Sequence, residues 1–219
     1  MVEGFFSESI IGRAQKNDLV SIKVHDLRAW TNGKHKIVDD RPFGGGAGMV
    51  LKPEPIFLAW NELKKTSSQL IYLCPDGEIL TSKISKELSE ASHLVFLSGH
   101  YEGIDERVRQ KVVTRELSIG DYVLTNGTIA AAVVIDSLLR HIKGVLGDEQ
   151  SLTQDSFEGN LLGFPQYTRP SSFEGLNIPD VLLSGNHGDI EDWRKKQRFL
   201  RTKKRRPDLY NLYRNTENE

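Results

Sequence analysis

Three short glycine-bearing turns carry the residue types that would enclose a small molecule. They are CPDG (74–77), SGHYEGIDERV (98–108) and IGDYVLTNG (119–127). Glycine lets backbone approach a ligand closely, and in open α/β sheets ligands bind outside the carboxyl ends of the strands. We therefore expect the turns to surround one ligand, although each could equally be a tight turn and nothing more. The apolar walls would come from Leu73, Tyr101, Tyr122 and Leu124.

Two charged residues, Asp155 and Arg140, are candidates for proton transfer and charge stabilisation. Asp155 stands in a polar stretch without periodicity, where a carboxylate is ordinarily only a loop residue. Arg140 stands near the end of the apolar stretch 129–142. Because a buried arginine is rare without a partner, we expect Arg140 to point into a cleft or an interface.

The stretch VDDRPFGGGAGM (38–49) has four glycines in the five positions from Gly44 to Gly48. It is not a Walker A loop, which needs lysine and then serine or threonine after its last glycine, because Met49 follows Gly48. No glycine stands three residues after Gly46, so GxGxxG is excluded too. Such a loop is either a flexible surface loop or a backbone segment that approaches a ligand and moves over a site.

The histidines and the one cysteine give no sign of metal or covalent-nucleophile chemistry. The six histidines show no metal-ligand spacing, and no Ser–His pair stands in a nucleophile elbow. Cys74 is the only cysteine, which excludes an intrachain disulfide and a cysteine-based zinc site.

A basic block occupies residues 194–206, with nine lysines or arginines and no acidic residue, in a chain of net charge -1. Such a block favours a polyanionic partner, nucleic acid first. The alternative is a solvated helix face above a core stripe of Ile190, Trp193 and Leu200.

The bulk composition of the 219 residues is that of a soluble globular protein, with 38% hydrophobic and 27% charged residues. The longest apolar run, IAAAVVI (129–135), is too short to span a bilayer. The first ten residues lack the pattern of a secretory signal. We therefore expect a cytoplasmic protein without a membrane partner.

Short apolar segments alternate with helical ones along the first two-thirds of the chain, which predicts an α/β fold with a mostly parallel sheet. The predicted strands are 19–24, 70–74, 93–97 and 119–124. The predicted helices are 54–65, 81–91 and a largely buried one at 129–142. Thr81 is placed to cap the second helix, with Ser82, Ser85 and Ser89 on its polar side.

The alternation of apolar and helical segments ends near residue 145. GVLGDEQSLTQDSFEGN is polar, holds three glycines and shows no period, which indicates a linker or a mobile loop. Three prolines and the basic, helical C-terminal part follow. We predict a first domain at 1–146, a connector at 147–158 and a second domain at 159–219.

Several of these segments occur in the same order in the TrmD family of bacterial tRNA (guanine-N1)-methyltransferases, which this sequence resembles. They are VDDRPFGGGAGM, SGHYEGIDERV, LSIGDYVLTNG, HIKGVLGDEQSLTQDSF, YTRPSSFEG and IPDVLLSGNH. The resemblance runs from about Ile11 to Tyr210, and its motifs are long and unusual.

The resemblance implies a SPOUT methyltransferase domain, an α/β domain with a parallel sheet and a trefoil knot at its C-terminal edge, followed by a small, mostly helical tRNA-binding domain. Knots are rare exceptions to chain topology, and no pattern of residues predicts one here. It further implies a homodimer, in which the connector and C-terminal domain of the other subunit complete each active site.

S-adenosylmethionine is the methyl donor that the resemblance implies, bound in a bent form in the knot. The donor-binding residues would be Tyr72, Leu73, Cys74, Pro75, Ser98, Gly99, Tyr101, Glu102, Ile119, Gly120, Asp121, Tyr122, Val123, Leu124 and Gly127. Members of the family are described as magnesium-dependent, but nothing in the sequence locates an ion.

The implied substrate is the guanosine immediately 3′ of the tRNA anticodon, preceded by another guanosine. By motif position, Asp155 would take the proton from N1 as general base, and Arg140 would stabilise the charge that develops on O6. Arg201, Lys203 and Lys204 would bind phosphates of the anticodon arm. The glycine loop would lie beside the site and adapt as donor and tRNA bind, with Asp39 and Arg41 as RNA contacts.

The sequence departs from the family pattern in a few places. The family has a first strand before its first helix, whereas this sequence begins with MVEGFF, where that helix should begin. The first domain would therefore lack this strand, or the true start lies upstream, and we hypothesise the latter. Ala47 replaces a common proline, and Thr128 stands where many members have glutamate.

Three alternatives remain. The first is a non-catalytic RNA-binding SPOUT homologue, which would have little need for Asp155, Arg140 and all three donor-binding turns. The second is a related SPOUT enzyme that modifies another base or tRNA position. The third is a nucleotide enzyme that binds phosphate with the glycine loop, against which the missing lysine argues.

Overall fold

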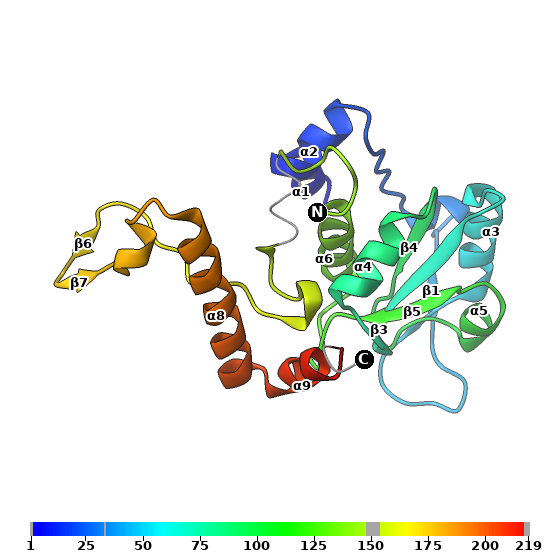
Figure 1. Ribbon diagram of the computed structural model, residues 1–219. Helices are drawn as coiled ribbons and strands as arrows, with labels where there is room; N and C mark the ends of the chain where they lie inside the picture. Colours follow the sequence, from blue (N-terminus) through cyan, green and yellow to red (C-terminus); the bar gives the residue numbers. More distant parts are fainter. Residues whose placement is uncertain (1, 33, 148–153, 217–219) are drawn as a thin grey trace. The chain divides into compact units, whose positions relative to one another are not determined.

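The computed structural model describes residues 2–32, 34–147 and 154–216, and the chain divides into two compact units, 1–147 and 148–219 (Figure 1). Each unit is described by itself. The functional roles assigned above to 1–146, 147–158 and 159–219 stay predictions.

A three-stranded parallel sheet organises the first unit. β3 (Gln69–Ile79) lies in the middle, with β4 (Leu94–Ser98) on one side and β5 (Arg115–Ser118) on the other. Both pairings of β3 are parallel. The predicted α/β class with a parallel sheet is therefore confirmed. A separate antiparallel pair, β1 (Asp39–Asp40) with β2 (Val50–Leu51), closes the glycine loop.

The helices of the first unit begin where the sequence offers caps. α1 (Glu3–Ser7), α2 (Ser9–Lys16), the 3₁₀ helix η1 (Leu27–Trp30), α3 (Pro53–Leu63), α4 (Ser82–Ser89), α5 (Glu106–Lys111) and α6 (Thr128–Leu139) follow in order. Thr81 caps α4 by accepting from the Ile84 N–H at 3.3 Å. Asp105 caps α5 by accepting from the Arg107 N–H at 2.9 Å. All three predicted helices are present.

Two of the predicted strands are wrong. Residues 19–24 form no strand and pair with no described strand, and the Ile22 N–H bonds instead to Gln15 Oε1 at 3.2 Å. Their apolar alternation reflects packing, because Val20 and Ile22 lie against the core. The third strand of the sheet is 115–118 rather than 119–124, since the chain leaves the sheet at Gly120, whose φ is +145°.

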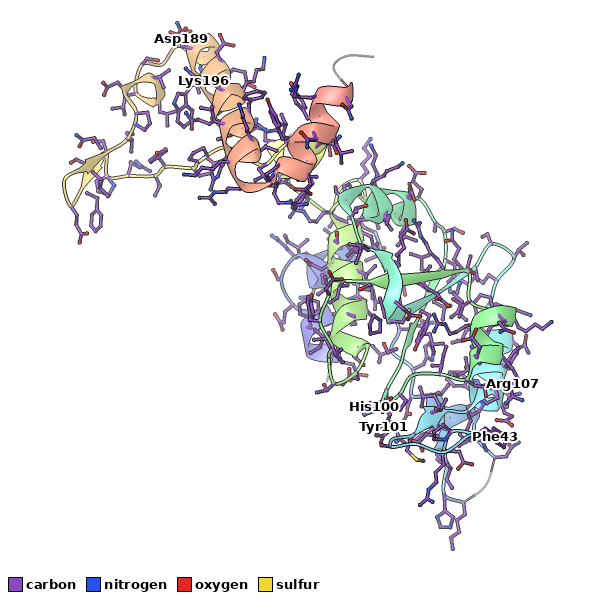
Figure 2. All side chains as sticks on the ribbon, turned by 90° about the horizontal axis from the view of Figure 1, so that it is seen from below. Phe43, His100, Tyr101, Arg107, Asp189 and Lys196 are labelled. Carbon is purple, nitrogen blue, oxygen red and sulfur yellow. The ribbon has the colours of Figure 1, made fainter. Side chains whose placement is uncertain are left out.

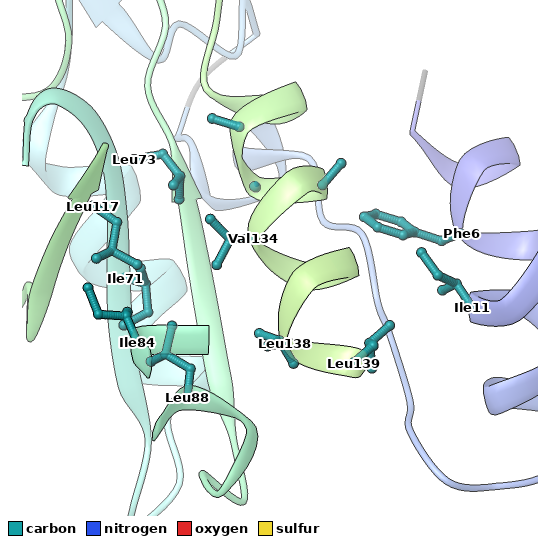
Figure 3. Packing of buried hydrophobic residues seen from close by; sticks show 13 residues of the cluster. Phe6, Ile11, Ile71, Leu73, Ile84, Leu88, Leu117, Val134, Leu138 and Leu139 are labelled. Atoms are coloured by element: carbon teal, nitrogen blue, oxygen red, sulfur yellow. The ribbon is translucent and has the colours of Figure 1, made fainter. Parts of the chain in front are cut away.

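The core surrounds β3 on both faces, because side chains alternate along a strand. Ile71 and Leu73 pack with residues of α4, α6 and β5. Tyr72 and Cys74 point to the opposite face and pack with residues of α3 and α5. Figure 3 shows α6 between the sheet and the first two helices, with Val134 toward Leu73 and with Leu139 near Ile11.

Ser85 is fully buried, which corrects its expected place on the polar side of α4. Its hydroxyl lies 2.7 Å from that of Ser137 on α6. The two hydroxyls satisfy one another, so the burial of two polar groups between the helices is tolerated.

The second unit consists of short elements followed by two helices. They are η2 (Glu158–Asn160), the hairpin β6 (Ser172–Phe173) and β7 (Leu176–Asn177), η3 (Asp180–Leu182), α8 (His187–Arg205) and α9 (Pro207–Thr216). Asn186 caps α8 through the N–H groups of Gly188 and Asp189. α9 packs on α8 through Phe199 and Tyr210, whose ring centroids are 5.1 Å apart.

The core stripe suggested for the basic helix is wrong in one of its members, because Leu200 is exposed. The inward face of α8 carries Phe199 and the fully buried Thr202 instead. The Thr202 hydroxyl accepts from the Leu162 N–H at 2.8 Å and so ties the helix to the segment after η2. Among the described residues, no helix is both long enough and apolar enough to cross a bilayer.

Candidate active site

Two of the expected turns, 98–108 and 119–127, follow β4 and β5 and line a pocket together with part of β3. The third expected turn, CPDG (74–77), is wrong, because these residues lie within β3, where the register with β5 shifts between Leu73 and Glu78. In the sheet register, Leu73 is opposite Ser98 on one side and Leu117 on the other. The chain leaves β4 and β5 at this level and forms the pocket walls. About 600 Å³ of empty space lies there, part of it open to solvent. This is the crevice in which open α/β sheets bind ligands.

Twelve of the fifteen residues expected to bind the donor line this pocket. They are Tyr72, Leu73, Cys74, Pro75, Gly99, Tyr101, Ile119, Gly120, Tyr122, Val123, Leu124 and Gly127. The other three, Ser98, Glu102 and Asp121, adjoin the pocket in sequence but do not line it. The structure therefore brings together residues of β3 and of both turns.

Six further residues line the pocket that the sequence analysis did not select. They are His100, Leu117, Ser118, Thr125, Asn126 and Ala130. Four of them, His100, Ser118, Thr125 and Asn126, stand next to a selected residue in the sequence, so adjacency was the only available signal. Leu117 belongs to β5, two positions before Ile119. Ala130 comes from the first turn of α6, and no property of its side chain marks it as part of a pocket.

The two turns cross at Gly127 with little room for a side chain. The Gly127 N–H donates to the Gly99 carbonyl at 2.9 Å. A Cβ on Gly127 would lie 3.1 Å from the Gly99 nitrogen and 3.2 Å from the Ser98 Cα. A larger residue at this position would push the turns apart and deform the pocket wall.

Tyr72 fits between two glycines beneath the pocket. A Cβ on Gly99 would lie 3.1 Å from the Tyr72 hydroxyl oxygen, and a Cβ on Gly103 would lie 3.0 Å from it. Burial is the main reason that the pKa of Tyr72 rises to about 12. The ring therefore contributes a neutral hydroxyl and an apolar face to the wall.

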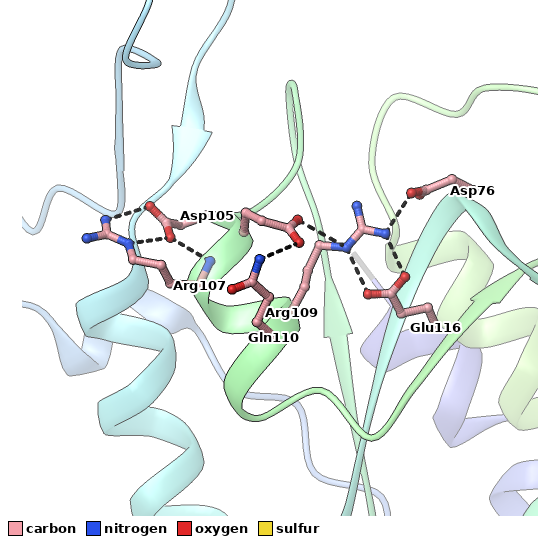
Figure 4. Close-up of polar contacts among 7 residues, drawn as sticks. Asp76, Asp105, Arg107, Arg109, Gln110 and Glu116 are labelled. Atoms are coloured by element: carbon pink, nitrogen blue, oxygen red, sulfur yellow. Dashed lines mark hydrogen bonds and ion pairs between the residues drawn. The ribbon is translucent and has the colours of Figure 1, made fainter.

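Arg109 does not line the pocket but connects residues next to two of its walls (Figure 4). The Arg109 guanidinium donates to both oxygens of Glu116 at 2.8 and 2.6 Å and to Asp76 at 2.6 Å. It also lies over the Tyr72 ring, 5.7 Å from the centroid. Asp76 follows the wall segment 72–75 and Glu116 belongs to β5, so this one side chain links two of the three walls.

The charges of Arg109, Asp76 and Glu116 affect the pKa of Cys74. Burial, and next a hydrogen bond with Asp76, raise the pKa of the Cys74 thiol to about 12. A hydrogen bond from Arg109 in turn lowers the pKa of Asp76. The thiol in the pocket wall is therefore protonated at neutral pH, whereas the carboxylate beside it is charged.

The glycine hairpin, residues 39–51, is anchored on the turn 98–108. The Glu102 N–H donates to the Met49 carbonyl at 3.0 Å, and the Leu51 N–H donates to the Gly103 carbonyl at 2.9 Å. Gly48 has a φ of +87°, a backbone conformation that other residues rarely adopt, so glycine is favoured at this contact. Of the two expected RNA contacts here, Asp39 is half-buried and Arg41 is exposed.

Arg140 does not line the pocket of its own chain. It follows the last residue of α6, ten residues after Ala130, which corresponds to about 15 Å along a helix. Its side chain is half-buried. If Arg140 acts at a pocket, the distance along α6 favours the pocket of another copy.

Asp155 belongs to the second unit and is half-buried. Of the expected connector 147–158, residues 148–153 lie outside the described residues. The Asp155 backbone carbonyl accepts from Arg198 at 3.4 Å, and the same guanidinium donates to the carbonyls of Leu162 and Glu158 at 3.2 and 3.0 Å. Arg198 therefore ties the segment that carries Asp155 to α8.

Some cations of the basic block contact other residues of the second unit, and others are exposed. Arg194 lies over the Phe164 ring at 4.9 Å, and Arg206 pairs with Asp208 at 2.6 Å, so both contribute to packing within the unit. Other cations are exposed, among them Lys196 (Figure 2), and the exposed Lys203 also lies over the Tyr210 ring at 5.7 Å. The exposed cations are Lys195, Lys196, Lys203, Lys204 and Arg205. Two of the three expected RNA-binding residues are thus exposed, and Arg201 is half-buried.

Within the described part of the chain, no three histidine, cysteine, aspartate or glutamate residues come together in a way that could hold a metal ion.

Comparison with known proteins gives one consistent result. The family model described as tRNA (Guanine-1)-methyltransferase TrmD matches residues 1–212. The chain is 51% identical over 220 residues to a tRNA (guanine-N(1)-)-methyltransferase of Staphylococcus haemolyticus, covering 100% of this chain and 90% of that protein. It is 52% identical to proteins of the same name in Dictyoglomus turgidum (95% and 85% covered) and Geobacillus kaustophilus (97% and 88% covered).

Proposed function

This chain belongs to the TrmD family of tRNA (guanine-1)-methyltransferases, and we propose that it transfers a methyl group from S-adenosylmethionine to N1 of the guanosine immediately 3′ of the anticodon. The observation that carries the proposal is the convergence of two separate turns and the irregular part of β3 on one pocket. In a tRNA methyltransferase, that pocket is the natural place for the donor.

The pocket fits the donor in its chemistry. Its walls are apolar side chains and turn backbone, and Tyr72 and Cys74 are both neutral at physiological pH because their pKa values are raised to about 12. Bound S-adenosylmethionine supplies an activated methyl group on a sulfonium centre. The walls hold the ligand in one orientation and exclude water, so that alignment with the acceptor supplies most of the catalysis.

Asp155 acts as the general base in this proposal. N1 of guanine carries a proton and is a poor nucleophile until that proton leaves. A carboxylate within hydrogen-bond reach accepts it as the methyl group is transferred. Negative charge then develops on O6, and the guanidinium of Arg140 stabilises it, because a fixed cation acts strongly in a site from which water is excluded.

A homodimer, in which the other copy's connector and C-terminal domain complete each pocket, is part of the proposal. Val123 in the turn 119–127 is 83% exposed, and Ile129 and Val133, one helical turn apart on α6, are 52% and 42% exposed. A helix that is apolar on all sides is normally covered. An apolar surface beside the pocket, together with the distance of Arg140 from its own pocket, supports pairing with a second copy.

The tRNA is bound through the exposed cations of the basic block on α8. Its lysines and arginines neutralise phosphates and release counterions, which favours association with any polyanion. The tight crossing at Gly99 and Gly127 supports the trefoil knot as the topology of the pocket. A cytoplasmic location fits a tRNA substrate. For the magnesium dependence that the resemblance implies, the described residues offer no group of three or more histidine, cysteine, aspartate or glutamate side chains.

Incubation with methyl-labelled S-adenosylmethionine and unmodified tRNA, followed by nucleoside analysis, tests the proposal. The label is expected in 1-methylguanosine, and a tRNA with adenosine at the target position serves as the control. Label in another nucleoside would point to a related SPOUT enzyme with another target. Binding of tRNA without any transfer would favour the non-catalytic RNA-binding homologue.

A further inference from the structure

Phe43, in the glycine hairpin, is the most exposed large apolar side chain among the described residues. Its exposure reaches 102% of the reference value, so nothing in the first unit covers the ring. Exposure of a whole phenylalanine ring to water is unfavourable relative to its burial. The fold gives no reason for an aromatic residue at this position.

The hairpin presents this ring away from the protein surface. Gly44, Gly45, Gly46 and Gly48 all have positive φ, between +80° and +115°. Cβ atoms placed on the first three would meet no atom within 4 Å, so the tip is surrounded by open space. The base of the hairpin, in contrast, is fixed by the pairing of β1 with β2 and by the bonds to Glu102 and Gly103.

The ring stands at the same end of the first unit as the outer wall of the pocket. Figure 2 shows Phe43, His100 and Tyr101 at this end, and Tyr101 is also largely exposed. The His100 and Tyr101 rings are 4.1 Å apart between centroids, so two adjacent aromatic rings lie at the edge of the pocket. Arg41 is exposed two residues before Phe43 and adds a cation. Exposed aromatic rings with a nearby arginine are typical of surfaces that bind single-stranded nucleic acid.

We propose that Phe43 is a stacking platform for an unpaired nucleobase of the tRNA, next to the base that is methylated. The proposal rests on the tRNA substrate of the proposed function. Each base has a face on which an aromatic ring stacks, and the target lies in an unpaired loop. The adenine of the donor is not the occupant, because Phe43 is not among the pocket-lining residues.

Replacement of Phe43 tests this with two variants and one control. Phe43→Leu keeps an apolar side chain but removes the ring, whereas Phe43→Tyr keeps the ring. Phe5→Leu removes an exposed ring elsewhere in the first unit and is the matched control. The kcat/KM for tRNA is expected to fall about tenfold in Phe43→Leu, equivalent to ~1.4 kcal/mol, and to stay near the wild-type value in Phe43→Tyr and Phe5→Leu.

A second measurement reports stacking without methylation. Anticodon stem–loops carrying 2-aminopurine in turn at each unpaired position beside the target are titrated with each variant. At one position, the 2-aminopurine fluorescence is expected to be quenched by the wild type and by Phe43→Tyr. The same fluorescence is expected to be quenched less by Phe43→Leu. The KM for the donor and the oligomeric state are expected not to change.

Three results would overturn the inference. They are unchanged tRNA kinetics with unchanged quenching in Phe43→Leu, a loss confined to donor affinity, and a change of oligomeric state. The first would leave the ring without a role in tRNA binding, the second would assign it to the donor pocket, and the third to an interface between copies. A wild-type protein that quenches but does not methylate would instead contradict the proposed function.

Discussion

The proposed proton transfer depends on the carboxylate of Asp155. Asp155→Asn keeps the size and shape of the side chain but cannot accept a proton from N1. We expect single-turnover methylation to fall by about 10²-fold or more, with donor binding by calorimetry near the wild-type value. Asp192→Asn, at an exposed aspartate of the same unit, is the control. Full activity of Asp155→Asn would remove Asp155 as the base.

Arg109 is expected to position the donor pocket without touching the ligand. Arg109→Met breaks the link between Asp76 and Glu116, so the two walls lose their common anchor. We predict a KM for the donor raised on the order of tenfold, with the KM for tRNA unchanged. In Arg109→Lys, the KM for the donor should lie between those of the wild type and Arg109→Met. The reason is that an ammonium lacks the planar fork that binds both oxygens of Glu116.

A purely structural role of Arg109 has a different signature. It would lower the folded fraction and kcat together and leave both KM values unchanged. The free energy of unfolding of each variant, measured beside the kinetics, separates the two cases.

Residues that act through distant partners were the ones that the sequence could not predict. The two pocket turns were predicted because each keeps its glycines and apolar residues within a few positions. Arg109 was missed, since Asp76 is 33 positions away from it, and no local pattern reveals such a pair. Ser85 was assigned to the wrong side of α4 for the same reason, because its partner is on another helix.

At the scale of one element, α8 is expected to provide the salt-dependent part of tRNA binding. Replacement of Arg201, Lys203 and Lys204 by alanine should weaken binding and reduce the slope of log K against log salt concentration. Each phosphate contact that is lost should change this slope by about 0.7–0.9. Filter binding at several salt concentrations measures it.

Lysines on a different helix are the control for this experiment. Lys83 and Lys86 are exposed on α4, and their replacement by alanine removes two positive charges from the first unit. The slope is expected to change less in this variant. Equal changes in both variants would mean that the overall charge of the protein, rather than α8, sets the salt dependence.

Whole elements were predicted best where propensity and burial agree. The segments 70–74 and 93–97 are strands, and the helices at 54–65, 81–91 and 129–142 are present. The prediction of a strand at 19–24 is wrong because a segment outside a sheet can also bury alternate residues. The prediction of a largely buried helix at 129–142 is confirmed for the faces toward the sheet and the first two helices. On a further side of this helix, Ile129 and Val133 are exposed.

At the scale of the molecule, alkaline pH is expected to destabilise the first unit. Burial raises the pKa of Tyr72 from 10.0 and that of Cys74 from 9.0, both to about 12. The folded state therefore retains protons that the unfolded chain loses between pH 9 and pH 12. The stabilisation is complete below about pH 9 and is lost as pH rises toward 12.

Urea unfolding between pH 7 and pH 11 measures this loss. Trp193→Phe leaves Trp30 and Trp60 as fluorescent reporters of the first unit. With the further replacements Tyr72→Phe and Cys74→Ala, the free energy of unfolding should be lower at pH 7 but should depend less on pH. An identical pH dependence in both proteins would show that these two groups do not govern alkaline unfolding.

The parallel α/β class was predictable from the alternation of apolar segments, whereas the knot and the dimer were not. A knot depends on the order in which segments cross, and a dimer depends on a second chain. The sequence patterns that predict helices and strands contain neither kind of information. Both came from the family resemblance, and in the structure their support is the glycine crossing and the exposed apolar side of α6.

One guanidinium, that of Arg198, holds the carbonyls of Asp155, Glu158 and Leu162, while neighbouring lysines of the same helix face solvent. If tRNA binds those lysines as proposed, the helix that holds the phosphates is also the one that positions the main chain at residue 155. The fit of the nucleic acid on α8 and the position of the proposed proton acceptor would then be coupled, so a poorly fitting substrate would also meet a misplaced base.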